Sequence, residues 1–254
     1  MRLEPGHGSE RNFKLKLEYD GTGLAGWQRQ PDRPTVQGHL EDVFFKLTGQ
    51  KVSVIGAGRT DAGVHALGQV AHFKAKTRLT PAELLRGANA LLIRRIAVLS
   101  LEEAPLDFHA RYHARSKVYD YDLYLAPVRS AMKRRFSWHI PSELDLKAMA
   151  RALKFLEGEH DFASFQSTGS SVESTVRCLF EVNLAAGPDG LVRITLEGNG
   201  FLRHMVRAIV GTLVEVGRSR ITPEAFQRIL EARDRSLAGI TAPAHGLCLR
   251  EVKY

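Results

Sequence analysis

The chain has 254 residues, of which 44% are hydrophobic and 25% are charged. This composition is typical of a globular protein and excludes a disordered or fibrous chain. The 36 Lys and Arg residues outnumber the 28 Asp and Glu residues, and the net charge of +8 favours a polyanionic partner such as nucleic acid. The alternative is a charge that only promotes solubility.

Other compositional features exclude several classes of protein. Cys178 and Cys248 are the only cysteines and have no paired spacing, so neither a disulfide framework nor a thiolate zinc site is expected. No apolar run reaches the length of about 18 residues that a spanning helix needs. The first ten residues lack the apolar stretch of a signal peptide. We therefore expect a cytoplasmic protein with no membrane association.

The first part of the chain alternates between strand and helix patterns. The elements expected in chain order are a strand (13–19), a helix (36–47), two strands (51–55 and 69–74), a helix (81–91) and a strand (96–101). Thr35 is expected to cap the first helix, and Thr80-Pro81-Ala82-Glu83 has the pattern of a capping box. This order is that of a split βαβ unit, in which Asp61 lies between the two central strands.

The second part follows the same order of elements. The elements expected in chain order are a strand (118–125), a helix (145–156), two strands (175–184 and 191–197), a helix (201–216), a short helix that begins at 222, and a strand (247–252). The turn Gly187-Pro188-Asp189-Gly190 indicates that the two middle strands form a hairpin. Shared order without evident sequence identity suggests a structural duplication.

We therefore predict an α+β fold of two similar split-βαβ halves, ferredoxin-like or RRM-like. The halves are expected to share a mostly antiparallel sheet covered by helices, with the active-site cleft between them. The joint is expected near 105–112. Residues 1–10 are expected to form a flexible tail. Residues 11–108 are expected to form an N-terminal subdomain that contains the loop 56–68. Residues 109–254 are expected to form a C-terminal subdomain that contains the basic segment and the helix 201–216.

Two motifs resemble functional sites only superficially. Gly21-Thr22-Gly23-Leu24-Ala25-Gly26 matches the dinucleotide fingerprint, but Pro31 and Pro34 follow where a helix should begin. A turn with glycines at positive φ, or a surface approached by RNA backbone, is the better interpretation. His109 and His113 have zinc-ligand spacing but lack the Glu of that motif and a helical context, so no metal is expected.

The segment Gly58-Arg59-Thr60-Asp61-Ala62-Gly63-Val64-His65-Ala66 places three ionisable side chains in one glycine-rich loop. For a generic Asp in such a loop, a local hydrogen bond that stabilises the turn is the ordinary interpretation. The segment, however, resembles the G-R-T-D-x-G-V-H-A signature of the TruA family of transfer-RNA pseudouridine synthases. Further matches occur in Tyr19-Asp20-Gly21-Thr22 with Gly26-Trp27-Gln28, in Lys117-Val118-Tyr119-Asp120-Tyr121, and in Gly200-Phe201-Leu202-Arg203-His204-Met205-Val206-Arg207.

This resemblance implies an enzyme that modifies uridines 38 to 40 in the tRNA anticodon arm, as a homodimer and without a cofactor. It implies that Asp61 is the nucleophile, Arg207 its ion-pair partner, and Tyr119 the residue on the target base. Leu247 would be an apolar contact beside the base, Arg59 would help to extrude it, and His65 belongs to the candidate substrate-binding set. Leu24 and Cys248 depart from the aromatic residues common at those positions.

The chemistry is consistent with these residue types. An Asp with an ordinary pKa near 3.9 is already ionised at neutral pH and needs no base to activate it. Burial under RNA would raise that pKa, and a nearby Arg would lower it again. Arg203 and Arg207 are four positions apart, so we expect both on one helix face, and the resemblance selects Arg207. Alternatively, Arg203 and Arg207 are two solvated arginines without a role in the reaction. Tyr119 could likewise be an ordinary tyrosine of the core.

The basic segment from His109 to His139 is the expected RNA contact, because its positive charge is clustered. Its candidate RNA-binding residues are Arg111, Arg115, Lys117, Lys133, Arg134 and Arg135. Two other functions remain open at this point. A non-catalytic RNA-binding module would need the basic segment but not Asp61, and an oxidoreductase would rest on Gly21 to Gly26 alone.

Overall fold

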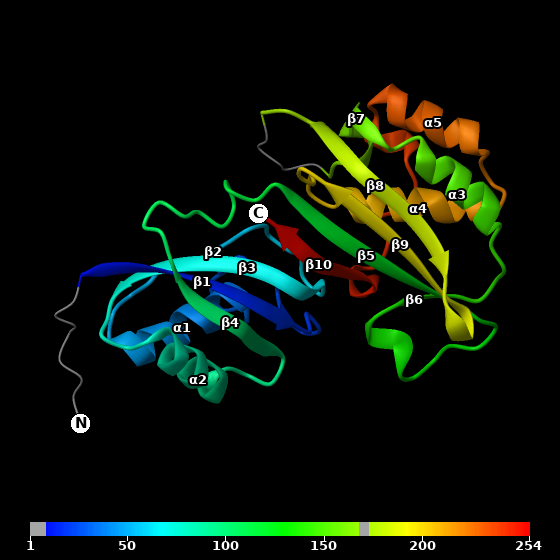
Figure 1. Cartoon of the computed structure of the whole chain (residues 1–254). Coiled ribbons are helices and arrows are strands. Elements are labelled where there is room, and N and C mark those ends of the chain that lie inside the picture. Colours follow the sequence, from blue (N-terminus) through cyan, green and yellow to red (C-terminus); the bar gives the residue numbers. More distant parts are fainter. Residues whose placement is uncertain (1–8, 168–172) are drawn as a thin grey trace. The chain divides into compact units, whose positions relative to one another are not determined.

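The computed structural model describes residues 9–167 and 173–254. The chain divides into two compact units (Figure 1). Unit 1 contains Met1–Arg115 and Leu249–Tyr254, and unit 2 contains Ser116–Cys248. The predicted joint at 105–112 lies a few residues earlier, and the end of the chain belongs to unit 1 because its last strand joins the sheet there.

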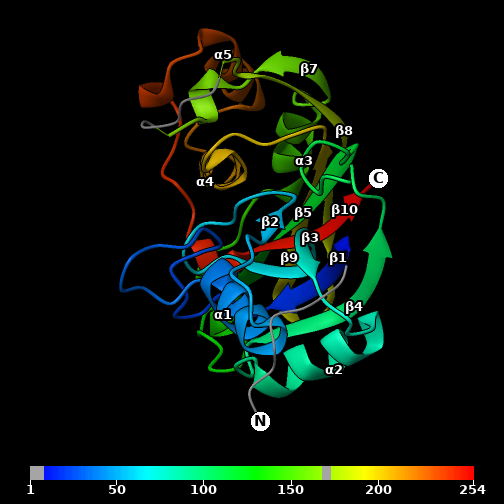
Figure 2. The same cartoon turned by 90° about the vertical axis from the view of Figure 1, so that its left-hand side faces the viewer.

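Unit 1 is a sheet with two helices on one face (Figure 2). Its elements are β1 (Glu10–Tyr19), α1 (Val36–Thr48), β2 (Ile55–Gly56), β3 (His65–Lys76), α2 (Pro81–Leu91), β4 (Ile96–Ala104) and, from Leu249 onward, β10 (Leu247–Lys253). The strand order is β4-β1-β3-β10, with β2 also paired to β3. Alternation along β1 buries Phe13, Leu15 and Leu17, and the ring of Phe73 on β3 stacks between Phe13 and Phe44 of α1 at 5.2 and 4.1 Å.

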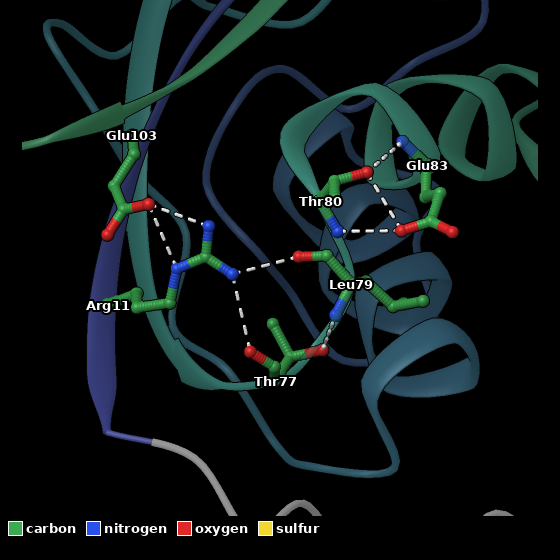
Figure 3. A network of polar contacts seen from close by, with 6 residues as sticks. All are labelled: Arg11, Thr77, Leu79, Thr80, Glu83 and Glu103. Atoms are coloured by element: carbon green, nitrogen blue, oxygen red, sulfur yellow. Dashed lines mark hydrogen bonds and ion pairs between the residues drawn. The ribbon is translucent and has the colours of Figure 1, made fainter.

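The helices of unit 1 begin where the sequence predicts. The Thr35 side chain accepts a hydrogen bond from the Gly38 amide and caps α1. Thr80 and Glu83 form the predicted capping box of α2 (Figure 3). Beside it, Arg11 of β1 pairs with Glu103 of β4 and donates to the carbonyls of Thr77 and Leu79. Arg11 thus fixes the connection between β3 and α2 to the sheet.

Unit 2 consists of strands packed against three helices (Figure 1). Its elements are β5 (Ser116–Leu125), β6 (Trp138–Ile140), α3 (Leu146–Lys154), β7 (Gly158–Asp161), β8 (Val176–Ala186), β9 (Leu191–Gly198), α4 (Met205–Gly217) and α5 (Pro223–Ala232). The strand order is β5-β9-β8-β7, and β6 pairs with β5. The helix expected over 145–156 is α3, which Asp145 caps, and α4 is almost wholly buried.

The predicted α+β class is confirmed. The pairs β1–β3, β1–β4, β2–β3, β5–β9, β7–β8 and β8–β9 are antiparallel, and β5–β6 is parallel. Unit 1 has the predicted order of strands and helices, and β8 and β9 form the predicted hairpin around residues 187–190. The short strands β6 and β7 were not predicted, because three or four residues do not establish a periodicity.

The predicted strand over 51–55 is wrong for four of its five residues. Val52 and Val54 are buried in the expected alternation, but only Ile55 and Gly56 pair with β3. Two side chains of α1 satisfy the backbone of Val54 instead: Glu41 accepts from its amide at 3.1 Å and Gln37 donates to its carbonyl at 3.1 Å. The alternation therefore reports burial rather than strand pairing.

Two boundaries also differ from the prediction. The helix expected from 201 begins at Met205, because His204 adopts a left-handed conformation with φ of 62°. At the start of the chain, Glu10 already belongs to β1, whereas residues 1–8 of the expected tail lie outside the described residues. In the described parts of the chain, none of the helices has the length and apolar character required to cross a membrane.

Candidate active site

Asp61 lies in the loop that connects β2 to β3, which we call the Asp61 loop (residues 57–64). Asp61 is half-buried, Arg59 is exposed and Thr60 is buried. The Thr60 carbonyl accepts from the Trp27 amide at 2.9 Å, and the Asp61 carbonyl accepts from the Val64 amide at 3.1 Å, which closes a turn. The Gly63 amide donates to the Leu24 carbonyl at 3.3 Å. The residues on both sides of Asp61 are therefore anchored through their backbones.

Glycines permit the close contact between this loop and the segment 20–27. A Cβ on Gly26, whose φ is +90°, would lie 2.6 Å from the Thr60 carbonyl oxygen. A Cβ on Gly21 would lie 2.1 Å from the carbonyl oxygen of Val64. No helix begins after Gly26, since α1 begins at Val36. The interpretation of this motif as a turn with glycines at positive φ is confirmed at Gly23 and Gly26, and the approaching backbone is that of the Asp61 loop.

Three buried polar side chains hold the Asp61 loop from within unit 1. The Tyr19 hydroxyl of β1 lies 2.8 Å from the Thr60 hydroxyl. Nε2 of Gln69, on β3, donates to the Gly58 carbonyl at 2.8 Å and to the Tyr19 hydroxyl at 3.4 Å. Sequence reasoning did not single out Gln69. The available signal was a polar residue within an otherwise apolar strand segment, Gly68-Gln69-Val70-Ala71.

His65 begins β3 and is only 4% exposed. Its Nδ1 accepts from the Gly21 amide at 3.0 Å and lies 3.3 Å from Oδ1 of Asp20. The Nδ1 atom of His65 thus contacts both the backbone and a side chain of the 20–27 turn. His65 therefore ties the 20–27 turn to the strand that follows Asp61.

The candidates of unit 2 lie on three different elements. Tyr119, on β5, is 7% exposed and packs edge-to-face with Phe201 at 4.9 Å between ring centroids. Arg207, on α4, donates from Nε to the Ala242 carbonyl at 2.8 Å. Leu247 begins β10 and is buried.

Tyr121 brings these elements of unit 2 together. It lies two residues from Tyr119 on the same face of β5, and its hydroxyl donates to the Pro243 carbonyl at 2.8 Å. A Cβ on Gly246 would lie 2.6 Å from its ring. Burial raises the pKa of Tyr121, while the positive charge of Arg207 acts in the opposite direction. Tyr121 thus connects β5 to the segment 243–246 that precedes β10.

The expectation that Arg203 and Arg207 share a helix face is wrong. Arg203 precedes α4 and is exposed, and its carbonyl accepts from the Ser167 amide at 3.1 Å. The left-handed turn at His204 separates Arg203 from the helix. Only Arg207 has a helical position.

The predicted RNA-binding residues lie in both units. Arg111 and Arg115 are exposed in unit 1, and Lys117 is half-buried at the start of β5. Lys133, Arg134 and Arg135 form a short 3-10 helix between β5 and β6. Lys133 donates to the Asp189 carbonyl at 3.0 Å and lies over the Tyr124 ring, so it also fixes the hairpin turn.

The two histidines with zinc-like spacing contact backbone amides. Nδ1 of His109 accepts from the amides of Arg111 and Tyr112 at 3.2 and 3.3 Å, and Nδ1 of His113 accepts from the His109 amide at 3.5 Å. Among the described residues, no three His, Cys, Asp or Glu side chains are grouped so that they could hold a metal ion.

Comparison with known proteins gives one consistent family. A family model described as tRNA pseudouridine synthase matches residues 17–113 and 152–254. The tRNA pseudouridine synthase A of Syntrophotalea carbinolica is 48% identical over 241 residues, or 95% of each chain. The proteins of that name from Pelobacter propionicus and Moorella thermoacetica are each 46% identical, and they cover 96% and 95% of this chain and 100% and 99% of their own length.

A solved H/ACA ribonucleoprotein bound to a substrate RNA that contains 2′-deoxyuridine also matches, with 12% identity and a TM-score of 0.32. It covers 85% of this chain and 55% of that one, and its TM-score is too low to indicate a shared fold. The sequence relatives, in contrast, span almost the whole chain at 46 to 48% identity. This chain therefore belongs to the TruA family of tRNA pseudouridine synthases.

Proposed function

We propose that this protein converts uridine to pseudouridine at positions 38, 39 and 40 of the tRNA anticodon arm, with Asp61 as the nucleophile. The observation that carries the proposal is the placement of Asp61. It stands within the family signature 58–66, on a half-buried loop that Trp27, Leu24 and Gln69 anchor through hydrogen bonds. A carboxylate held in this way can be presented to a ribose carbon in one orientation.

The reaction requires the bond between ribose C1′ and uracil N1 to break. The Asp61 carboxylate bonds to C1′ as the uracil leaves through N1. The uracil then turns, C5 bonds to C1′ as the carboxylate leaves, the proton on C5 is lost and N1 is protonated. The Asp61 carboxylate needs no separate base, because a carboxylate is ionised at neutral pH. The chemistry needs no redox partner, so we propose that no cofactor takes part.

The family resemblance assigns further roles to residues of unit 2 and to two other residues of unit 1. Arg207 would pair with the Asp61 carboxylate and keep it ionised beneath bound RNA, since a nearby positive charge favours the charged form. Tyr119 would stack on the flipped uracil, and Leu247 would supply an apolar contact beside it. Arg59, which is exposed, would help to extrude the nucleotide, and His65 would act through the 20–27 turn that it holds.

Tritium release from uracil C5 tests this function directly. We expect the wild-type protein to release tritium from tRNA labelled at C5, and Asp61→Asn to release none above background, because Asn keeps the shape but not the charge. Asp42→Asn is the matched control, because Asp42 is an exposed carboxylate on α1 that pairs with Arg29 at the surface. Release by Asp61→Asn near the wild-type rate would contradict the assignment of the nucleophile.

The choice of uridine needs a separate measurement. We expect tRNAs with a single uridine at position 38, 39 or 40 to be modified, and a tRNA with other nucleotides at all three positions to release no tritium. Release from the last substrate would contradict the proposed positions while leaving the synthase activity in place.

We also propose a cytoplasmic homodimer, which would present two basic faces to one tRNA. Light scattering of the purified protein should then give twice the mass of one 28.3 kDa chain. A single-chain mass at micromolar concentration would contradict the dimer.

A further inference from the structure

Gln69 and Tyr19 form a hydrogen-bonded chain beneath the Asp61 loop. Nε2 of Gln69 donates to the Tyr19 hydroxyl, and this hydroxyl lies 2.8 Å from the Thr60 hydroxyl. The same Nε2 donates to the carbonyl of Gly58 at 2.8 Å. The chain therefore contacts two of the three residues that precede Asp61, once through a backbone carbonyl and once through a side chain.

The contact with Gly58 also determines how the Gln69 amide is oriented. A carbonyl oxygen accepts only from a donor, so Nε2 must face Gly58. Oε1 then points elsewhere, and it is buried with no hydrogen-bond donor among the described residues. Gln69 itself is 0% exposed. An unsatisfied buried acceptor weakens a fold, so stability alone would favour an apolar residue at this position.

We propose that Gln69 is a positioning residue for Asp61, and that it acts through Gly58 and through Tyr19 and Thr60. The inference rests on the proposed role of Asp61 as nucleophile. Hydrogen bonds from Trp27 and Val64 hold the Thr60 and Asp61 carbonyls, and the Gln69 chain holds the segment before them. Without it, Gly58, Arg59 and Thr60 can shift, and the carboxylate shifts with them. A misplacement of about 1 Å at a reacting group can lower a rate about 100-fold.

Gln69→Met separates this positioning role from a purely structural one. Met is similar in length to Gln and packs well among the apolar side chains of the strand. We expect the single-turnover rate of tritium release to fall about 10- to 100-fold. The Kd for tRNA should stay within about twofold and the Tm within about 2 °C of the wild type. The pH profile should be lowered evenly at every pH, since Gln69→Met replaces one uncharged side chain with another.

Tyr254→Phe is the matched control. It also removes one hydrogen bond of a tyrosine in unit 1, that of the Tyr254 hydroxyl to the Ala110 carbonyl at 2.6 Å, at a position outside the Asp61 loop. We expect it to lower the Tm and to leave the single-turnover rate unchanged. Tyr19→Phe, in contrast, breaks the chain and should lower the rate.

The pair Thr60→Val and Thr60→Ser gives the same test without changing Gln69, should Gln69→Met fail to fold. Val removes the hydroxyl that contacts Tyr19, and Ser restores it, so only Val should lose rate. A single-turnover rate of Gln69→Met or Thr60→Val within twofold of the wild type would overturn the inference. A loss of rate that is accompanied by a matching weakening of tRNA binding, or by a matching fall in Tm, would also overturn it. An inactive wild-type protein would instead contradict the proposed function.

Discussion

Two tyrosines on one face of β5 differ in their surroundings. The hydroxyl of Tyr121 donates to the Pro243 carbonyl, and burial raises its pKa, so it stays protonated and supports the structure. Tyr119 packs the edge of its ring against Phe201. Of the two, Tyr119 is the one that the family motif assigns to the target base. Its hydroxyl is therefore our candidate for accepting the C5 proton in the last step.

Tyr119→Phe tests this assignment, because it removes the hydroxyl and keeps the ring. If the hydroxyl accepts the C5 proton, the single-turnover rate should fall by about 100- to 10,000-fold, the usual contribution of a general base. The Kd for tRNA should change little, because the ring that stacks on uracil is retained. Rapid-quench tritium release and a filter-binding titration measure the two quantities. A rate within threefold of the wild type would show that another group takes the proton.

At the scale of elements, β3 acts as a support for three different loops. His65 accepts from the Gly21 amide, Gln69 donates to the Gly58 carbonyl, and His72 accepts from the Ala110 amide. All three side chains are buried polar groups on a strand that otherwise packs apolar residues. Loops have few contacts of their own, so a rigid strand must define their positions.

His72 makes one of these attachments sensitive to pH. Burial, followed by the positive charges near it at His109, Lys74 and His113, lowers its pKa from 6.5 to about 4. The pKa is lower in the folded state, so the unfolded chain takes up a proton first as the pH falls. The contribution of His72 to stability is therefore complete above pH 6.5 and decreases as the pH falls from 6.5 towards 4. His109, whose pKa is lowered mainly by burial, acts in the same direction.

His72→Gln should remove that share of the pH dependence, because Gln can accept from the Ala110 amide without titrating. Between pH 7 and 4.5, we expect the variant to lose about 2 kcal/mol less unfolding free energy than the wild type, given about 1.4 kcal/mol for each pKa unit. Urea unfolding at several pH values measures this difference. His160→Gln, a half-buried histidine of unit 2, is the control. Parallel curves for His72→Gln and the wild type would contradict the expectation.

At the scale of the whole molecule, the net charge of +8 favours RNA binding only where the basic side chains can reach phosphates. Arg134 and Arg135 lie in the 3-10 helix between β5 and β6, whereas Arg151 and Lys154 of α3 pair with Glu224 and Glu157. Arg134 and Arg135 are the candidates for a phosphate contact, because they belong to the basic segment 109–139 in which the positive charge is clustered. Lys133 is less suitable for this test, since it also holds the turn at Asp189.

Replacing Arg134 and Arg135 together with Gln should lower the salt dependence of tRNA binding. Each lost phosphate contact reduces the slope of log K against log salt by about 0.7 to 0.9, so we expect a decrease of about 1.4 to 1.8. Arg151→Gln with Lys154→Gln removes the same net charge and should leave the slope nearly unchanged. Equal slopes for the two double variants would mean that net charge, and not this 3-10 helix, attracts the RNA.

Local sequence rules predicted much of the fold. Thr35 and Thr80 cap helices where the patterns place them, because a cap depends on a side chain and an amide two or three residues away. The hairpin at 187–190 depends on equally local turn residues. Asp61 stood out only through its family signature, since many loops contain an Asp among glycines.

The sequence by itself therefore determined the α+β class, most of the elements and the identity of the signature that contains Asp61. Only the tertiary structure decided that Val54 is satisfied by α1 instead of a strand, that Arg203 precedes its helix, and that Gln69 supports the Asp61 loop. These contacts join residues that are distant along the chain or follow from one backbone angle. Periodicity along the chain reports which side chains are buried, and only packing in three dimensions specifies the partners that bury them.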